Sequence, residues 1–237
     1  MKTIIALMIL FISTLGHASC VILLHGLARS ESSMDKLAQT LTDNGFMSVN
    51  LGYPSRDHAI ELLADKAITP ALKACDGTTK INFVTHSLGG ILVRQYLSTQ
   101  TIPNLRYVVM LSPPNKGSEV VDKLAGMPGF YWLNGDAGLQ LGTDALSVPN
   151  TLGPANFNLG VIAGNQSINW ILSLLIPGSD DGKVSIARTK IQGMNDHIEM
   201  PTTHPLMMKN NDVISQVIYY LNNGEFNHGS SKSSRKN

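Results

Sequence analysis

Ser87 stands where an apolar run of the sequence meets two glycines. The stretch Phe83-Val-Thr-His-Ser-Leu-Gly-Gly90 is typical of a buried strand that ends at a serine and passes directly into a helix. A serine on such a turn is held exposed at the top of a sheet, where it can act as a nucleophile. The glycines let the helix pass close to the strands, and its N-terminus favours developing negative charge. The usual pattern is Gly-x-Ser-x-Gly, and Thr85 here replaces the first glycine.

A serine hydroxyl needs a base to remove its proton near neutral pH, and histidine is the usual base. His204 and His197 both come late in the chain, before the last predicted helix. His204 lies nearer that helix and after the expected last strand, so we favour it as the base and keep His197 as the alternative. The other five histidines are weaker candidates. His17 and His228 lie near the ends of the chain, and His58 comes too early in the chain, at the start of a predicted helix. His25 and His86 lie beside the proposed site, in motifs where histidines more often pack or brace loops.

An acidic side chain must hold the imidazole in the correct tautomer and stabilise its charged form. The segment Ser179-Asp-Asp-Gly-Lys-Val184 follows a predicted strand and its loop. An aspartate just before glycine, on a turn at the sheet edge, can reach the histidine. We therefore favour Asp181, with Asp180 as the alternative that would cap the turn and Asp196 as a weaker competitor.

Acyl transfer also needs hydrogen-bond donors for the oxyanion. One donor would be the backbone N–H of Leu88, directly after the nucleophile. The other would be the N–H of Leu27, in the loop after the first predicted strand, where Gly26 lets the backbone approach. Both donors are backbone N–H groups, which any residue except proline supplies. The sequence can therefore indicate where they lie, but their side chains give no signal of the role.

Strand-like and helix-like segments alternate along the chain. Short apolar runs predict strands at 21–24, 46–51, 81–84, 107–111 and 159–163. Apolar residues at helical spacing predict helices at 30–44, 60–71, 88–97 and 213–221. The apolar strands show no clean polar alternation, which is typical of a sheet buried on both faces. The pattern predicts the α/β class, with a mostly parallel, doubly wound sheet flanked by helices and catalytic groups at the carboxyl ends of the strands.

Taken together, these segments resemble the α/β-hydrolase superfamily, and within it the bacterial lipase- and esterase-like group. Five motifs carry the resemblance, in the expected order: Val21-Ile-Leu-Leu-His-Gly-Leu27, Phe83 to Gly90, Leu111-Ser-Pro-Pro-Asn-Lys-Gly-Ser118, Asp181-Gly-Lys-Val184 and His204. The resemblance implies hydrolysis of carboxylic esters. It implies that Ser87 is the nucleophile and that Asp181 and His204 are its relay partners. Leu27 and Leu88 would be the oxyanion donors.

The resemblance also implies a short cap over the acyl site. Residues 116–156 are the candidate segment, since the Pro-Asn-Lys-Gly-Ser motif leads into them. Three consecutive aromatic residues within it, Phe130, Tyr131 and Trp132, would contact the acyl group or, equally, serve ordinary packing.

The first residues are typical of a secretory signal peptide. Met1-Lys2 gives a positive start, residues 3–15 are largely apolar, and Gly16 and Ala18 are small. We predict cleavage after Ala18 and an exported protein, periplasmic or secreted; the alternative is membrane anchoring by an uncleaved N-terminus. Residues 19–224 would form the hydrolase domain, and residues 225–237 a disordered tail.

The chain has two cysteines. Cys20 opens the first predicted strand, and Cys75 ends a helix just before the Ser87 strand. Adjacent parallel strands begin at the same sheet edge, so geometry allows a disulfide in an oxidising compartment. Two buried free thiols are the alternative.

The formal net charge of +1 gives no reason to expect a nucleic-acid partner. The sequence shows no metal-ligand cluster, phosphate loop or nucleotide fingerprint, so it implies neither metal nor cofactor. The expected partner is a small-molecule or lipid ester, while membrane-surface contact and oligomeric state stay open. The leading hypothesis is an exported serine esterase or lipase that forms an acyl-enzyme. An acyltransferase or an amide or thioester hydrolase would use the same residues, and a non-catalytic binding module would be expected to lack one of them.

Overall fold

The structure is a computed structural model that describes residues 19–229. The predicted signal peptide and the end of the predicted tail lie outside these residues. One six-stranded sheet forms the centre, in the order β2-β1-β3-β4-β5-β6, and all of its strand pairings are parallel. The strands are β1 (Cys20–Leu24), β2 (Met47–Asn50), β3 (Ile81–His86), β4 (Leu105–Leu111), β5 (Leu159–Gly164) and β6 (Asp196–Met200). The predicted parallel sheet is confirmed.

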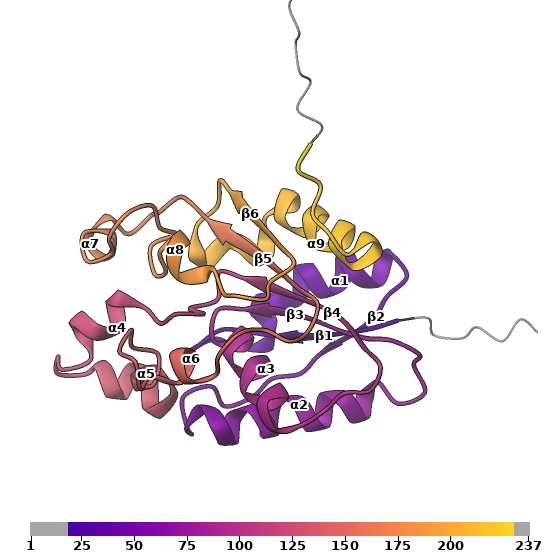
Figure 1. The fold of residues 1–237 in the computed structure, drawn as a ribbon, viewed down its shortest axis with the longest axis horizontal. Helices are drawn as coiled ribbons and strands as arrows, with labels where there is room; N and C mark the ends of the chain where they lie inside the picture. Colours follow the sequence, from indigo (N-terminus) through magenta and orange to yellow (C-terminus); the bar gives the residue numbers. More distant parts are fainter. Residues whose placement is uncertain (1–18, 230–237) are drawn as a thin grey trace, which may run out of the picture.

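Helices cover both faces of the sheet (Figure 1). α1 (Asp35–Asp43) and α9 (Asn211–Asn223) lie on one face, and α2 (Ile60–Ala74) and α3 (Leu88–Thr99) on the other. Within residues 19–229, no helix has the length and apolar character needed to cross a membrane. The remaining helices are short: η1 (Glu31–Met34), α4 (Glu119–Leu124), α5 (Phe130–Leu139), α6 (Val148–Thr151), α7 (Trp170–Ser173), α8 (Ile186–Thr189) and η2 (His204–Lys209).

Alternate residues of each central strand serve two separate apolar cores. In β1, Ile22 and Leu24 pack toward α2 and α3, while Val21 and Leu23 pack toward α1 and α9. All four side chains are buried. Because both faces of the strand meet helices, the sequence of β1 is uniformly apolar, as the doubly wound interpretation required.

The longest connections leave the carboxyl edge of the sheet after β4 and β5. The first, residues 112–158, holds α4, α5 and α6, and the second, residues 165–195, holds α7 and α8. Since β4 and β5 are adjacent and parallel, both connections emerge at the same edge. Figure 1 shows them at one end of the long axis of the molecule.

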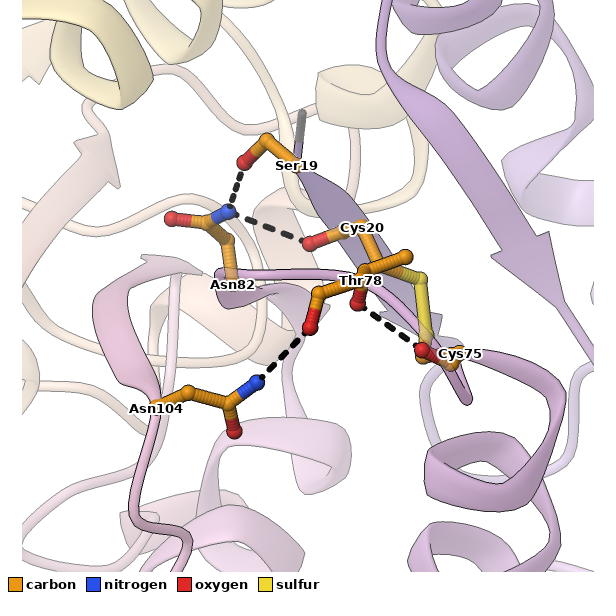
Figure 2. The surroundings of a disulfide bond; sticks show 6 residues. All are labelled: Ser19, Cys20, Cys75, Thr78, Asn82 and Asn104. Atoms are coloured by element: carbon orange, nitrogen blue, oxygen red, sulfur yellow. Dashed lines mark hydrogen bonds between the residues drawn. A yellow bond between two sulfur atoms is a disulfide. The ribbon is translucent and has the colours of Figure 1, made fainter. Parts of the chain in front are cut away.

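A disulfide joins Cys20 at the start of β1 to Cys75 at the end of α2 (Figure 2). The predicted pairing is confirmed. Beside it, the Asn82 side-chain amide donates to Ser19 Oγ and to the Cys20 carbonyl oxygen, at 2.7 and 3.1 Å. The cross-link spans 55 residues of sequence, and closing a loop of that length stabilises a fold by about 4 kcal/mol in the chain-entropy description. The amino edge of the sheet is therefore fastened.

Residues 225–229, which the sequence assigned to a disordered tail, pack against the domain. Phe226 is 3% exposed and lies against the Tyr220 ring, with centroids 4.7 Å apart. Asp196 accepts the Phe226 N–H at 2.7 Å and pairs with His228 at 2.9 Å. The tail prediction is wrong for these five residues, because one buried aromatic side chain outweighs their polar composition.

Candidate active site

The backbone makes a sharp turn at Ser87, between β3 and α3. Its φ of 53° and ψ of −118° place a non-glycine residue at positive φ, a costly conformation that persists only where the surroundings impose it. The Ser87 N–H donates to the Leu111 carbonyl oxygen at 2.9 Å, which ties the turn to β4. At Gly89, a Cβ atom would lie 2.6 Å from the Leu24 carbonyl oxygen. Only glycine therefore lets α3 leave the turn so close to β1.

Asp181 and His204 are in direct hydrogen-bond contact. His204 Nδ1 lies 2.6 Å from Asp181 Oδ2, and both residues are buried. The other carboxylate oxygen accepts the backbone N–H groups of Lys183 and Val184 at 3.0 and 2.9 Å. Because the carboxylate holds the proton on Nδ1, the Nε2 of His204 is left as an acceptor.

The charge of Asp181 is stabilised by its partners. Burial raises its pKa, but the charge of His204 and hydrogen bonds from His204, Ser112 and Val184 outweigh burial and leave the pKa below its ordinary value. Sequence reasoning missed Ser112, which follows β4 directly and also accepts the Gly164 N–H at 3.1 Å. Its place at the carboxyl end of a strand is the signal that could have found it.

His86 braces the backbone of His204. Its Nε2 lies 3.0 Å from the His204 carbonyl oxygen, and the two ring centroids are 4.7 Å apart. Burial, followed by the neighbouring His204, holds the pKa of His86 well below its ordinary value. The ring is therefore neutral and donates from Nε2, which agrees with the bracing role that the sequence indicated.

The loop after β1 lies against the serine turn. A Cβ on Gly26 would meet the Ser87 Cβ at 3.3 Å, so a side chain there would separate the loop from the turn. His25 stiffens the loop: its ring stacks on Tyr53 with centroids 4.0 Å apart, and its Nδ1 lies 2.9 Å from the Gly26 carbonyl oxygen.

The two predicted oxyanion donors flank this contact along the chain. Leu27 follows Gly26, and Leu88 follows Ser87 as the first residue of α3. Neither backbone N–H has a hydrogen-bond acceptor among residues 19–229. Both donors are thus available to a ligand.

One pocket gathers most of the predicted site. Its lining residues come from the loops after β1, β3 and β4, from α4 and α5, from the segment before α8 and from the start of η2: Leu27, Arg29, His86, Ser87, Pro114, Ser118, Val120, Val121, Phe130, Asn134, Leu141, Lys183, Val184 and His204. A wider cleft of about 550 Å³ lies at the amino ends of β4 and β5, and none of its lining side chains ionises. That cleft therefore lacks the acid–base groups that the predicted chemistry needs, whereas the first pocket contains Ser87 and His204.

The comparisons with known proteins concern structure alone. No protein-family model and no curated protein sequence matches the chain. The mature form of lipase BlEst2 from Bacillus licheniformis aligns with a TM-score of 0.63 and 18% identity, over 87% of this chain and 91% of that one. The metagenomic carboxyl esterase MGS0156 aligns with a TM-score of 0.60 and 17% identity, over 81% and 65%. Phospholipase PlaB from Legionella pneumophila aligns with a TM-score of 0.56 and 21% identity, over 73% and 46%.

The chain has the α/β-hydrolase fold. Its single sheet of parallel strands, flanked by helices, matches these neighbours across most of the chain. In an α/β-hydrolase fold the carboxyl edge carries the reactive groups, and here that edge carries Ser87, Asp181 and His204.

The alternative histidine and aspartates of the sequence analysis are engaged elsewhere in this α/β-hydrolase fold. His197, at a position where the sequence analysis predicted no strand, belongs to β6, and its Nε2 lies 3.2 Å from Thr189 Oγ1. Asp180 caps its own turn by accepting the Gly182 N–H at 2.6 Å. Asp196 accepts the Phe226 N–H and pairs with His228. β6 is a half-exposed edge strand that contains polar residues, so it lacks the apolar run by which the other strands were predicted.

Of the three consecutive aromatic residues, only Phe130 lines the pocket. Tyr131 is 57% exposed and Trp132 is 78% exposed, and neither borders the pocket. Successive helical residues are about 100° apart around the axis, so α5 can direct only one of the three inward. The predicted acyl contact therefore holds for neither Tyr131 nor Trp132.

Proposed function

We propose that this protein is a serine hydrolase that cleaves carboxylic esters through an acyl-enzyme on Ser87. One observation carries the proposal: a buried hydrogen bond of 2.6 Å joins Asp181 to His204, which lines the same pocket as Ser87. Such a pair turns an imidazole into a base for a hydroxyl group. Neighbours described as lipase, carboxyl esterase and phospholipase support an ester as the bond that is cleaved.

In the proposed reaction, Ser87 Oγ attacks the ester carbonyl carbon and passes its proton to His204 Nε2. The oxyanion that forms accepts hydrogen bonds from the N–H groups of Leu27 and Leu88, while Asp181 stabilises the imidazolium. The alcohol leaves with the proton from His204, and an acyl-enzyme remains. Water then attacks the acyl carbonyl, again with His204 as base, and releases the acid and the free serine.

Labelling with a fluorophosphonate tests the proposal directly. One equivalent should attach to the wild-type protein and none to Ser87→Ala, while Ser98→Ala, at an exposed serine of the same helix, should label fully. Circular dichroism confirms that each variant is folded. A folded wild type that stays unlabelled contradicts the proposal. Adding an alcohol acceptor to a p-nitrophenyl ester assay then separates hydrolysis from acyl transfer, since hydrolysis is indifferent to the alcohol.

We place the substrate at a lipid surface, because two uncharged segments project beside the site. Residues 124–135 and 165–179, called the apolar arms below, contain no charged side chain. They hold both tryptophans of the chain, Trp132 at 78% and Trp170 at 71% exposure. Tryptophan favours the boundary between water and lipid, and exposed apolar patches of this kind mark contact surfaces. Other large exposed side chains of the arms are Met127, Tyr131, Leu133, Ile168, Ile171 and Leu174.

Both apolar arms leave the carboxyl edge of the sheet, one after β4 and one after β5 (Figure 1). The first arm also contains Phe130, whose side chain lines the pocket. An ester drawn from a lipid layer would thus pass from exposed aromatic residues to the half-buried Phe130 on the same helix.

We also propose export, as the disulfide and the predicted leader both indicate. A disulfide between Cys20 and Cys75 persists in an oxidising compartment and is rare in the cytosol. N-terminal sequencing of protein from the periplasmic or external fraction should begin at Ser19. An intact Met1 on that protein contradicts cleavage and favours the anchored alternative.

A further inference from the structure

Two cationic side chains, Arg29 and Lys183, line the same pocket as Ser87 and His204. Arg29 lies two residues after Leu27, in the loop that carries one proposed oxyanion donor. Lys183 lies on the turn whose backbone holds the carboxylate of Asp181. Each of two loops that build the site therefore contributes one positive charge to the pocket.

Neither cation is in direct contact with an acidic side chain of the described residues. Within residues 19–229, the Arg29 guanidinium and the Lys183 ammonium take part in no ion pair and no hydrogen bond. The neighbouring carboxylate of Asp181 is already engaged by His204 and by two backbone N–H groups. The pocket therefore has positive charge without a matching acceptor.

Two less exposed cations of the fold have protein partners. Arg94 donates to the carbonyl oxygens of Asn115, Pro149 and Gly153. Arg188 pairs with Glu119 at 2.8 Å. Within the described part of the chain, Arg29 and Lys183 have no such partner, and what distinguishes them from unpaired cations elsewhere on the surface, such as Lys66, is that both line the pocket of Ser87 and His204.

The two charges also act on each other. Lys183 keeps part of its surface exposed, yet desolvation, followed by the charge of Arg29, lowers its pKa below the ordinary value. An anion between two such groups relieves their repulsion and accepts charge-assisted hydrogen bonds from both. The planar guanidinium suits a phosphate or carboxylate, since it can donate two parallel hydrogen bonds to two oxygens.

We propose that the pocket selects esters that carry an anionic group near the scissile bond, and that Arg29 and Lys183 bind this group. The inference rests on the proposed ester hydrolysis and names its substrate class. The anion is either a phosphate on the alcohol side, as in a glycerophosphate ester, or a carboxylate on the acyl side, as in a dicarboxylic half-ester.

Two matched pairs of soluble substrates test the inference and separate the two sources. Dibutyrylglycerol phosphate is compared with dibutyrylglycerol, and p-nitrophenyl hydrogen glutarate with p-nitrophenyl methyl glutarate. We expect kcat/KM to favour the anionic member of at least one pair by about tenfold or more, the size expected when a charged hydrogen-bond partner is present. The pair that shows the preference identifies which anion the site binds.

Variants locate the preference. Arg29→Gln and Lys183→Met should each reduce the anionic-to-neutral ratio about three- to tenfold, and the double variant should bring it close to one. Lys66→Met removes the same charge from the exposed surface of α2 and should leave the ratio at the wild-type value. Because Lys183 lies on the Asp181 turn, the exposed Arg29 supplies the variant that does not disturb the turn.

Equal kcat/KM for charged and neutral members of both pairs overturns the inference, as does a preference that survives the double variant or disappears equally in Lys66→Met. None of these outcomes affects labelling of Ser87 by a fluorophosphonate. A labelled, active enzyme without charge preference therefore contradicts only the anion site, whereas a folded but unlabelled protein contradicts the proposed function itself.

Discussion

The catalytic rim and the apolar arms leave the same edge of the sheet but are held in different ways. The catalytic rim, our name for the proposed triad Ser87, Asp181 and His204, is fixed by backbone N–H groups, a buried carboxylate and a bracing His86. The apolar arms, residues 124–135 and 165–179, present their largest side chains to solvent. The protein itself thus positions the groups that need a precise geometry. The large side chains of the arms, in contrast, are exposed to solvent.

Asp181→Asn should break the catalytic rim with the largest effect. An amide in place of the carboxylate would favour the wrong tautomer of His204 and would not stabilise its charged form. We expect kcat for a soluble ester to fall by about 10⁴-fold with the fold intact. Asp180→Asn, which alters the turn cap and the hydrogen bond from Ser173 but not the contact with His204, should lower kcat far less. Equal losses in the two variants would contradict the assignment of the relay carboxylate.

The same carboxylate should make stability depend on pH. The pKa of Asp181 is lower in the folded protein than its ordinary value of 3.8, since the charge of His204 and several hydrogen bonds outweigh burial. Its stabilising contribution is therefore complete above about pH 4 and is lost as the pH falls through the lower folded pKa. Thermal unfolding should show a gap between wild type and Asp181→Asn at pH 6 that narrows below pH 4. A constant gap would contradict the pKa shift.

Arg94 joins α3, the helix that follows Ser87, to the connection that carries the first apolar arm. Its replacement should lower the free energy of unfolding. Arg94 is 4% exposed on α3 and donates to the carbonyl oxygens of Asn115, Pro149 and Gly153, which belong to the connection that carries the first arm. Burial lowers the pKa of Arg94 to about 10, so the guanidinium stays charged at neutral pH. Arg94→Met leaves these acceptors without donors, at about 1–3 kcal/mol for each buried group.

We expect urea unfolding of Arg94→Met to show a loss of about 3–5 kcal/mol, allowing for partial rescue by water. Arg94→Lys restores only part of the donor set and should recover a fraction of this loss. A change below about 1 kcal/mol for Arg94→Met would mean that the network does not hold the connection in place.

The position of Ser87, Asp181 and His204 at one edge of the sheet was predictable because each of them follows a strand in chain order. The serine turn needs only a short local pattern, and the parallel sheet brings distant loops to one edge. The alternatives His197 and Asp196 could not be dismissed from sequence. The strand that contains them, β6, reads Asp-His-Ile-Glu-Met and lacks the apolar run that marked the central strands.

The apolar arms were less predictable, because orientation depends on tertiary contacts. The sequence of α5 has no apolar stripe at helical spacing, so nothing in it distinguishes the inward Phe130 from the outward Trp132. The same holds for Phe226, whose burial depends on a contact with Tyr220. Patterns along the chain give the elements, but long-range packing decides which side chain of an irregular element turns inward.

The smallest expected effect concerns vesicle binding by the apolar arms. It tests directly whether the arms, unlike the catalytic rim, contact a lipid surface. Both tryptophans of the chain lie in the arms, so its tryptophan emission reports on the arms alone. Vesicles should shift this emission to shorter wavelength, and Trp132→Phe and Trp170→Phe each leave a single reporter in one arm. Both reporters should respond if both arms enter the lipid.

Alanine at either position should weaken vesicle binding by about three- to tenfold, because a large apolar side chain gains about 1.5–3 kcal/mol on full burial and less at an interface. Leu62→Ala, at a 47% exposed leucine of α2, is the matched control and should bind vesicles as the wild type does. The unfolding free energy of each variant should stay within about 0.5 kcal/mol of the wild type, as expected for exposed positions. Emission unchanged at saturating vesicles, or an equal loss of binding in Leu62→Ala, would show that the arms do not meet the lipid, and the contrast between rim and arms would then need a different partner.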